Sequence, residues 1–88
     1  MHNVDKSSNF KYKYSKLPLR LRRLTDEAVE IIREHPTDFK NRITHISNRK
    51  EGALYRFRQP GCYLIYIVPE PEVEGEAVTI IMMDLKAL

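Results

Sequence analysis

A short run of alternating aromatic and basic residues lies near the start of the chain. Phe10, Tyr12 and Tyr14 alternate with Lys11 and Lys13. A period of two is typical of a half-buried strand, and outward-facing lysines protect an edge strand. We therefore predict the first strand at residues 10–14. Residues 1–8 are polar and carry no period, which predicts a disordered terminus.

A helical period follows from Leu17, because apolar residues recur at steps of three and four at Leu21, Leu24, Ala28, Ile31 and Ile32. This spacing predicts a helix that starts at Pro18, a favoured first-turn residue, and ends at His35, before a second proline. A second interpretation starts the helix at Thr25, whose hydroxyl can cap it, and leaves residues 17–24 as a separate turn. The pattern is compatible with one helix or with two.

The second half of the chain contains three strand-like runs, at residues 53–58, 62–68 and 77–84. The turn at 59–61 and the polar segment at 69–76 separate them, and such short connections join antiparallel neighbours. The middle run is apolar on both faces and is predicted to be the central strand. Before these runs, Thr37 and Asp38 can cap a short helix, but Ile43 and Ile46 also fit an extended segment.

This order of elements predicts an α+β fold: an N-terminal strand, one or two helices, then a three-stranded antiparallel meander with the helices packed on one sheet face. With 88 residues, 42% hydrophobic, the chain is expected to form a single domain. Its longest apolar stretch is too short to span a membrane, so we expect a cytoplasmic protein. A lone cysteine and three scattered histidines indicate neither a metal nor a cofactor.

The charge is distributed unevenly along the chain. Residues 1–58 hold 14 Lys and Arg against 7 Asp and Glu, whereas residues 59–88 hold 1 against 5. The net charge of +3 thus combines a basic first part with an acidic last part. A basic segment favours an anionic partner such as nucleic acid. The same composition is also compatible with a basic surface that binds no partner. The candidate RNA-binding residues are Arg20, Arg22, Arg23, Arg49 and Lys50.

Several short motifs occur in an order that resembles a known family. Leu17-Pro18 leads into the helix, His35-Pro36 ends it, and LYRFR at 54–58, PG at 60–61 and LIY at 64–66 precede a final strand at 78–85. This arrangement resembles the RelE/ParE superfamily of toxins from type II toxin–antitoxin systems. The resemblance implies a small basic protein that inhibits growth and is neutralised by a cognate antitoxin. Members are either ribosome-dependent messenger-RNA endonucleases or inhibitors of a protein target such as gyrase.

The endonuclease chemistry implied by the resemblance is attack of a ribose 2′-OH on the adjacent phosphate. This reaction needs positive charge on the phosphate and groups that accept and donate a proton. Arg56 and Arg58 are two residues apart on a predicted strand, so they share one face and can grip a phosphate. By resemblance, Arg58 matches the catalytic arginine of the sheet, and Lys86 matches the basic residue after the last strand. The predicted catalytic residues are therefore Arg58, Arg56 and Lys86.

Two departures from the family pattern affect catalysis more than fold. Where the family carries an arginine after a Gly-x-Tyr run, this chain has Leu64. The residues after Lys86 include no tyrosine or histidine to act as acid or base. His45 is the nearby candidate for proton transfer, although a plain surface histidine is the simpler interpretation. The hypotheses are thus an mRNA endonuclease, a toxin that binds a protein target, or a degenerate relative that binds only its antitoxin or nucleic acid.

Overall fold

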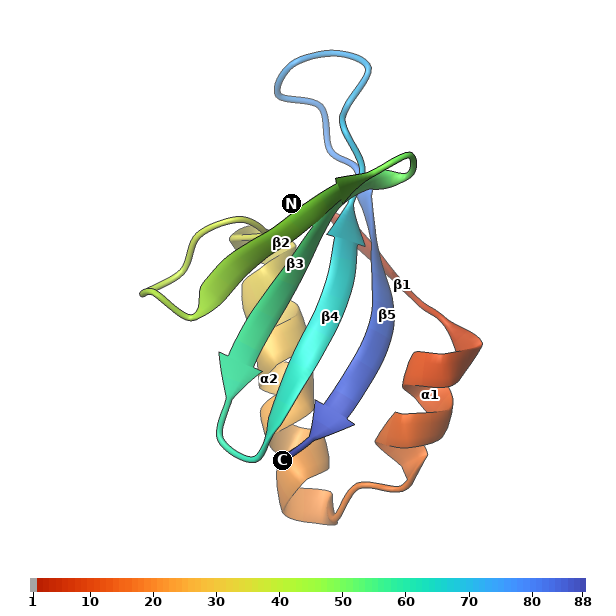
Figure 1. The fold of residues 1–88 in the computed structure, drawn as a ribbon, viewed down its shortest axis with the longest axis vertical. Coiled ribbons are helices and arrows are strands. Elements are labelled where there is room, and N and C mark those ends of the chain that lie inside the picture. The colour runs from red at the N-terminus through yellow and green to blue at the C-terminus, as the bar shows by residue number, and fades with distance from the viewer. Residues whose placement is uncertain (1) are drawn as a thin grey trace.

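The computed structural model describes residues 2–88, which form one mixed sheet and two helices. The strands are β1 (Asn3–Lys6), β2 (Ile43–Arg49), β3 (Gly52–Gln59), β4 (Cys62–Val68) and β5 (Thr79–Ala87). Their order in the sheet is β1-β5-β4-β3-β2 (Figure 1). Strands β2 to β5 form an antiparallel meander, and β1 pairs with β5 in parallel.

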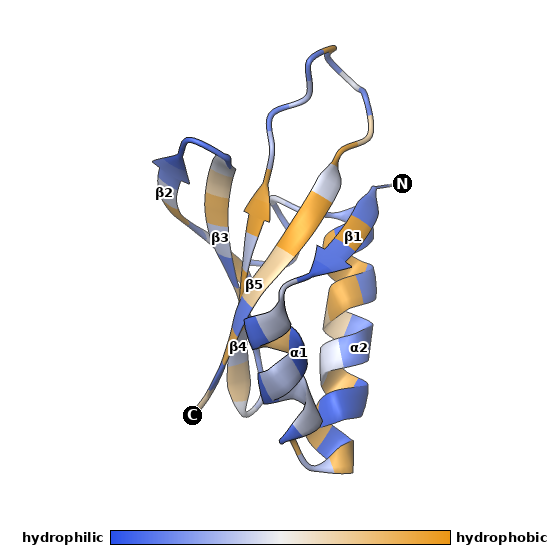
Figure 2. Cartoon of the chain, turned by 90° about the vertical axis from the view of Figure 1, so that its right-hand side faces the viewer, coloured by the Kyte–Doolittle hydropathy of each residue, from blue (hydrophilic) through white to orange (hydrophobic). Residues whose placement is uncertain are grey.

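The two helices lie on one side of the sheet. Helix α2 (Leu19–Glu34) runs behind the sheet in Figure 1 and forms the second layer in Figure 2, whereas α1 (Ser8–Ser15) lies along β5. Between the layers is a core to which both helices and the three central strands contribute, made by Phe10, Ala28, Val29, Ile32, Phe57, Cys62, Leu64, Tyr66, Ile80, Met82 and Leu85. No helix among residues 2–88 is long and apolar enough to cross a membrane.

The strand predicted at residues 10–14 is wrong, because these residues form α1. Phe10 and Tyr14 are four residues apart and therefore share a helix face as readily as a strand face. Phe10 is buried and Tyr14 is half-buried, while Tyr12 is 64% exposed. Ser7 caps the helix by accepting a hydrogen bond from the Phe10 N–H at 3.1 Å. The alternating pattern is compatible with a strand or a helix, and the Ser7 cap favours the helix.

The predicted disorder of residues 1–8 is also wrong for the described part of that segment, and residue 1 lies outside the described residues. Residues 3–6 form β1, which pairs with residues 79–82 of β5. Val4 is the sole apolar residue of this strand, so the sequence carries almost no local signal for it. The stabilising partner lies more than 70 residues away and becomes adjacent only in the folded chain.

The helix before the second proline is continuous. It runs from Leu19 to Glu34, with Pro18 at its N-cap and His35 at its C-cap, as the first interpretation predicts. Thr25 does not start a helix: it is fully buried, and its hydroxyl donates to the Leu21 carbonyl at 2.8 Å. A mid-helix threonine can satisfy its hydroxyl in this way without breaking the helix.

The three predicted strands of the meander are present as β3, β4 and β5, but the meander has a fourth strand. Residues 43–49 extend as β2 beside β3 rather than forming a short helix. Lys40 and Asn41 adopt positive φ angles of 48° and 59°, which ends any helix after Phe39 and turns the chain into β2. The fold class is thus α+β as predicted, with a larger, mixed sheet.

Candidate functional site

The sheet has one face packed against α2 and one face that no helix among residues 2–88 covers, which we call the open face. Phe57 lies in the core, so its neighbours Arg56 and Arg58 lie on the open face because side chains alternate along a strand. The same alternation and the strand register place further residues on this face, namely Leu54, Tyr63, Ile65, Ile67, Asp84 and Lys86.

Three predicted catalytic residues meet on the open face. Arg58 pairs with Tyr63 on β4, and Tyr63 pairs with Lys86 on β5, so they form one row across three strands. Arg56 lies in the next row, and its guanidinium carbon is 4.7 Å from the centre of the Tyr63 ring. This cation–π contact orients Arg56 over the middle of the sheet. The result is three cationic groups arranged around one aromatic ring.

Arg42, which directly precedes β2, holds the backbone of Arg58 near the end of β3. The Arg58 N–H donates to the Arg42 carbonyl at 2.9 Å, and Arg42 Nε donates to the Arg58 carbonyl at 3.0 Å. The Arg42 guanidinium also lies over the Phe57 ring, 4.6 Å from its centre. Arg42 therefore has a structural role, which leaves the exposed Arg58 side chain available to a ligand.

Beside the basic row, the open face contains a hollow of about 410 Å³. Its floor is apolar, with Ile46, Leu54, Ile65, Ile67 and Met83, and its polar lining consists of Asn9, Arg49, Asp84 and Lys86. Lys86 belongs both to this hollow and to the row with Arg58 and Tyr63. An apolar floor with a cationic rim fits a planar base attached to a phosphate.

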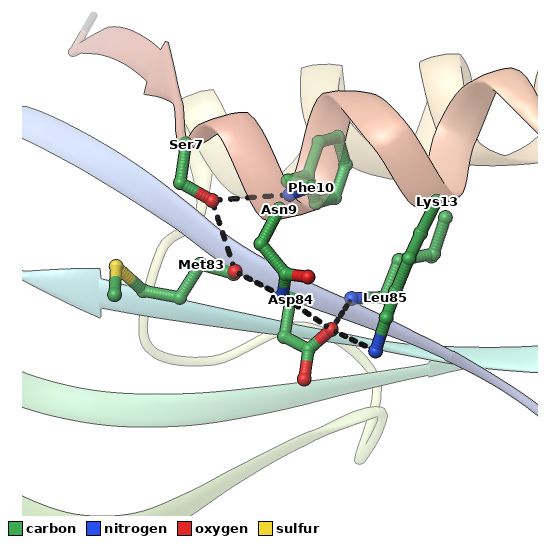
Figure 3. Close-up of polar contacts among 7 residues, drawn as sticks. All are labelled: Ser7, Asn9, Phe10, Lys13, Met83, Asp84 and Leu85. Atoms are coloured by element: carbon green, nitrogen blue, oxygen red, sulfur yellow. Dashed lines mark hydrogen bonds and ion pairs between the residues drawn. The ribbon is translucent and has the colours of Figure 1, made fainter.

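Asp84 is the acidic residue of this hollow, and α1 holds it in place (Figure 3). Its Oδ1 accepts hydrogen bonds from Lys13 Nζ at 2.7 Å, from Asn9 Nδ2 at 3.0 Å and from the Leu85 N–H at 2.7 Å. Burial raises the pKa of the Asp84 carboxyl, but these hydrogen bonds and the charge of Lys13 outweigh it and lower the pKa below its usual value. Asp84 is therefore ionised at neutral pH.

The five predicted RNA-binding residues are not brought together. Arg49 and Lys50 lie at the turn between β2 and β3, and of these Arg49 lines the hollow. Arg20, Arg22 and Arg23 belong to the first turns of α2, in the layer on the opposite side of the sheet. The arginines of α2 and the hollow of the open face are therefore separate basic surfaces.

His45 does not join the arginines. It pairs with Tyr55, which lies on the α2 side of β3, and the two ring centres are 5.2 Å apart. Its Nε2 lies 3.0 Å from the Asn48 side-chain oxygen, on an exposed part of β2. Leu64 is fully buried in the core, so an arginine at this position would point away from the open face. Neither His45 nor Leu64 lies on the open face, so neither takes part in a reaction beside Arg56 and Arg58.

Sequence reasoning missed two features of this site. Tyr63 could have been placed beside Arg58 from the turn at 59–61, which sets the register, together with the alternation of residues 62–68. Asp84 and its partners on α1 had no such signal, since the sequence predicts a strand at Lys13 and no element at Asn9. Residues 2–88 contain no cluster of three or more His, Cys, Asp or Glu side chains that could hold a metal ion.

Comparisons with known proteins give a structural relative. Neither the protein-family models nor the curated proteins match the sequence. Among solved structures, the chain is similar to a chain of the archaeal RelE–RelB complex from Pyrococcus horikoshii OT3, with 21% sequence identity and a TM-score of 0.78. The alignment covers 98% of this chain and 93% of the archaeal one. The similarity therefore spans the whole sheet and both helices, and the protein has the RelE-like fold that its motifs predicted.

Proposed function

We propose that the protein is the toxin of a type II toxin–antitoxin pair and acts in the cytoplasm as a ribosome-dependent messenger-RNA endonuclease. The observation that carries this proposal is the group formed by Arg56, Arg58 and Lys86 around Tyr63 on the open face. The RelE-like fold supports it, because the similar archaeal chain comes from a RelE–RelB complex.

The basic row suits the phosphate of the scissile bond. Cleavage by the ribose 2′-OH places additional negative charge on the phosphate oxygens in the transition state, and fixed guanidinium and ammonium groups stabilise that charge. Arg56 and Arg58 provide the planar donors that bind two phosphate oxygens at once, and Lys86 provides a point charge from the other side of Tyr63.

An antitoxin protein is the expected cognate partner. An acidic antitoxin segment over the open face would neutralise the same groups that bind phosphate, so the antitoxin and the RNA would compete. We expect the toxin and antitoxin to form a heteromeric complex in which Arg56, Arg58 and Lys86 are covered.

A second function is favoured by one observation. The histidine considered for proton transfer, His45, lies on the other face of the sheet from Arg56 and Arg58. A toxin without a proton acceptor would act by binding alone, for example on a protein target such as gyrase. A degenerate relative that binds only an antitoxin or nucleic acid would cause no growth arrest at all.

Inducible expression in a bacterium distinguishes these functions, with growth followed alongside mapping of messenger-RNA 5′ ends. We expect growth arrest with new cuts in translated message for the wild type, and neither effect for Arg58→Ala. Lys11→Ala is the matched control, because Lys11 is an exposed cation on α1 away from the row. A folded Arg58→Ala variant that still cuts message would contradict the proposed site. Arrest with intact message and DNA damage would instead indicate a protein target.

A further inference from the structure

We infer that Asp84 is the general base of the proposed reaction, with its free oxygen Oδ2 accepting the proton of the ribose 2′-OH. This inference rests on the proposed endonuclease function and names the proton acceptor that the sequence motifs do not supply. It is carried by the position of Asp84 in the hollow of the open face and by the asymmetry of its two oxygens.

The carboxylate is held by one oxygen only. Oδ1 accepts all three hydrogen bonds, from Lys13, Asn9 and the Leu85 N–H, while Oδ2 accepts none from the described residues. In Figure 3, Oδ2 points away from α1, toward the side of β5 on which β4 lies. Three donors on one oxygen fix the orientation of the group, and the other oxygen remains available to a substrate.

A bulge in β5 gives Asp84 this orientation. The pairing of β4 with β5 shifts between Ile65 and Tyr66, so two residues, Met83 and Asp84, separate the inward-facing Met82 and Leu85. A bulge of this kind redirects a side chain and commonly occurs near active sites. Here α1 stabilises the bulge, since the Ser7 hydroxyl donates to the Met83 carbonyl at 3.0 Å.

The hollow places Asp84 beside Lys86, one of the three proposed phosphate-binding residues. Asp84 and Lys86 line the same hollow, and two residues of one strand on one face are about 7 Å apart along it. Arg56 lies across from Asp84 through Ile65, at a separation of two strand spacings or about 10 Å. A phosphate above Tyr63 thus lies between Arg58 and Lys86, and its 3′-linked ribose can lie over Ile65, within reach of Oδ2.

Asp84 and Lys86 account for both proton transfers that the cleavage step requires. Asp84 Oδ2 takes the 2′-OH proton as the 2′-oxygen forms a bond to phosphorus, and the bond from phosphorus to the 5′-oxygen of the next nucleotide breaks. The departing 5′-oxygen takes a proton from the Lys86 ammonium, so the products are a 2′,3′-cyclic phosphate and a free 5′-OH. Water then returns Asp84 and Lys86 to their starting protonation states.

Ionisation of Asp84 before RNA binds is ensured by its hydrogen bonds, as its lowered pKa indicates. Bound RNA removes water from the hollow and brings a negative phosphate close to the carboxylate. Both changes raise a carboxyl pKa, so RNA binding itself makes Asp84 a stronger base.

Single-turnover cleavage of a ribosome-bound message tests this role, with RNA binding measured on the same variants. For Asp84→Asn we expect cleavage to be slower by at least about 100-fold, since general bases contribute at least this factor. We expect RNA binding to equal that of the wild type or to be tighter. Lys11→Ala is the matched control, because Lys11 is an exposed cation of α1 that is not among the donors to Asp84. It should cleave within about tenfold of wild type, and Asp84→Glu should recover part of the lost rate.

The outcomes separate this inference from the proposed function. If wild type cleaves, Arg58→Ala does not, and a folded Asp84→Asn cleaves within about threefold of wild type, Asp84 is not the base and the endonuclease function stands. Parallel loss of binding and cleavage in Asp84→Asn would show a structural role and would also overturn the inference. If wild type fails to cleave ribosome-bound message, the endonuclease function is wrong and the role of Asp84 is overturned with it.

Discussion

Two tyrosines on β4 have different environments because they lie on opposite faces of the sheet. Tyr63 is half-buried on the open face, where Arg56 lies over its ring. Tyr66 is fully buried on the α2 side, and its hydroxyl donates to the Pro36 carbonyl at 2.7 Å. Burial raises the pKa of Tyr66 far above its usual value, so the hydroxyl stays protonated and remains a donor. This bond ties the end of α2 to the centre of the sheet.

At the residue scale, we predict that Tyr66→Phe lowers the free energy of unfolding by about 1–2 kcal/mol, because it leaves the Pro36 carbonyl without its donor. Tyr12→Phe is the control, since Tyr12 is exposed and its hydroxyl makes no hydrogen bond among the described residues. Urea unfolding followed by circular dichroism measures both. Equal stability of the two variants would show that the Tyr66 bond contributes nothing net.

At the scale of elements, β3 begins where it passes very close to the end of β4. Gly52 has a φ of 146°, and a Cβ atom there would lie 2.5 Å from the Val68 carbonyl oxygen. Backbone atoms cannot move away as a flexible side chain can. This contact fixes the start of the strand that carries Arg56 and Arg58, and it therefore sets their position on the open face.

We predict that Gly52→Ala destabilises the protein by about 2–4 kcal/mol, because it combines an unfavourable φ with a backbone clash. Gly75→Ala should cost only about 1 kcal/mol. Gly75 has a φ of 83° but no atom within 4 Å of its Cβ position, so it isolates the conformational effect from the clash. Chemical denaturation of both variants gives the difference. A Gly52→Ala variant no less stable than Gly75→Ala would refute the close contact.

At the scale of the whole molecule, charge is separated along the strands. The loop after β4 carries Glu70, Glu72, Glu74 and Glu76 and extends beyond the sheet at the end opposite the turn that follows Arg58 (Figure 1). Acidic residues are thereby kept away from the row of Arg58 and Lys86. Asp84 is the exception on the open face, and its partner Lys13 offsets its charge.

We predict a salt dependence of RNA binding that reports on this row. Three phosphate contacts on single-stranded RNA should give a slope of about −2 for log K against log salt, and Arg58→Ala should reduce its magnitude by about 0.7. Lys11→Ala changes the net charge equally but removes no contact on the open face. Fluorescence anisotropy over a range of salt concentrations measures the slopes. The open face is not the RNA site if both variants change the slope equally.

Much of the architecture could be predicted because its signals are local. The extent of α2 follows from the helical period between Leu17 and Ile32 and from the proline on either side of it. The pairing of β3 with β4 follows from the turn at Pro60-Gly61. Alternation along β3 was enough to place Arg56 and Arg58 on one face. These features depend on residues within a few positions of one another, so the chain order alone specifies them.

Only the tertiary structure decided the features that join distant residues. The short β1 exists because β5 offers it an edge, and residues 8–15 are helical because Ser7 caps them and Phe10 reaches the core. Asp84 enters the candidate site through a bulge that α1 holds in place, with donors more than 70 residues away. Local periodicity carries no information about such contacts, because they form only when the sheet packs against the helices and brings distant residues together.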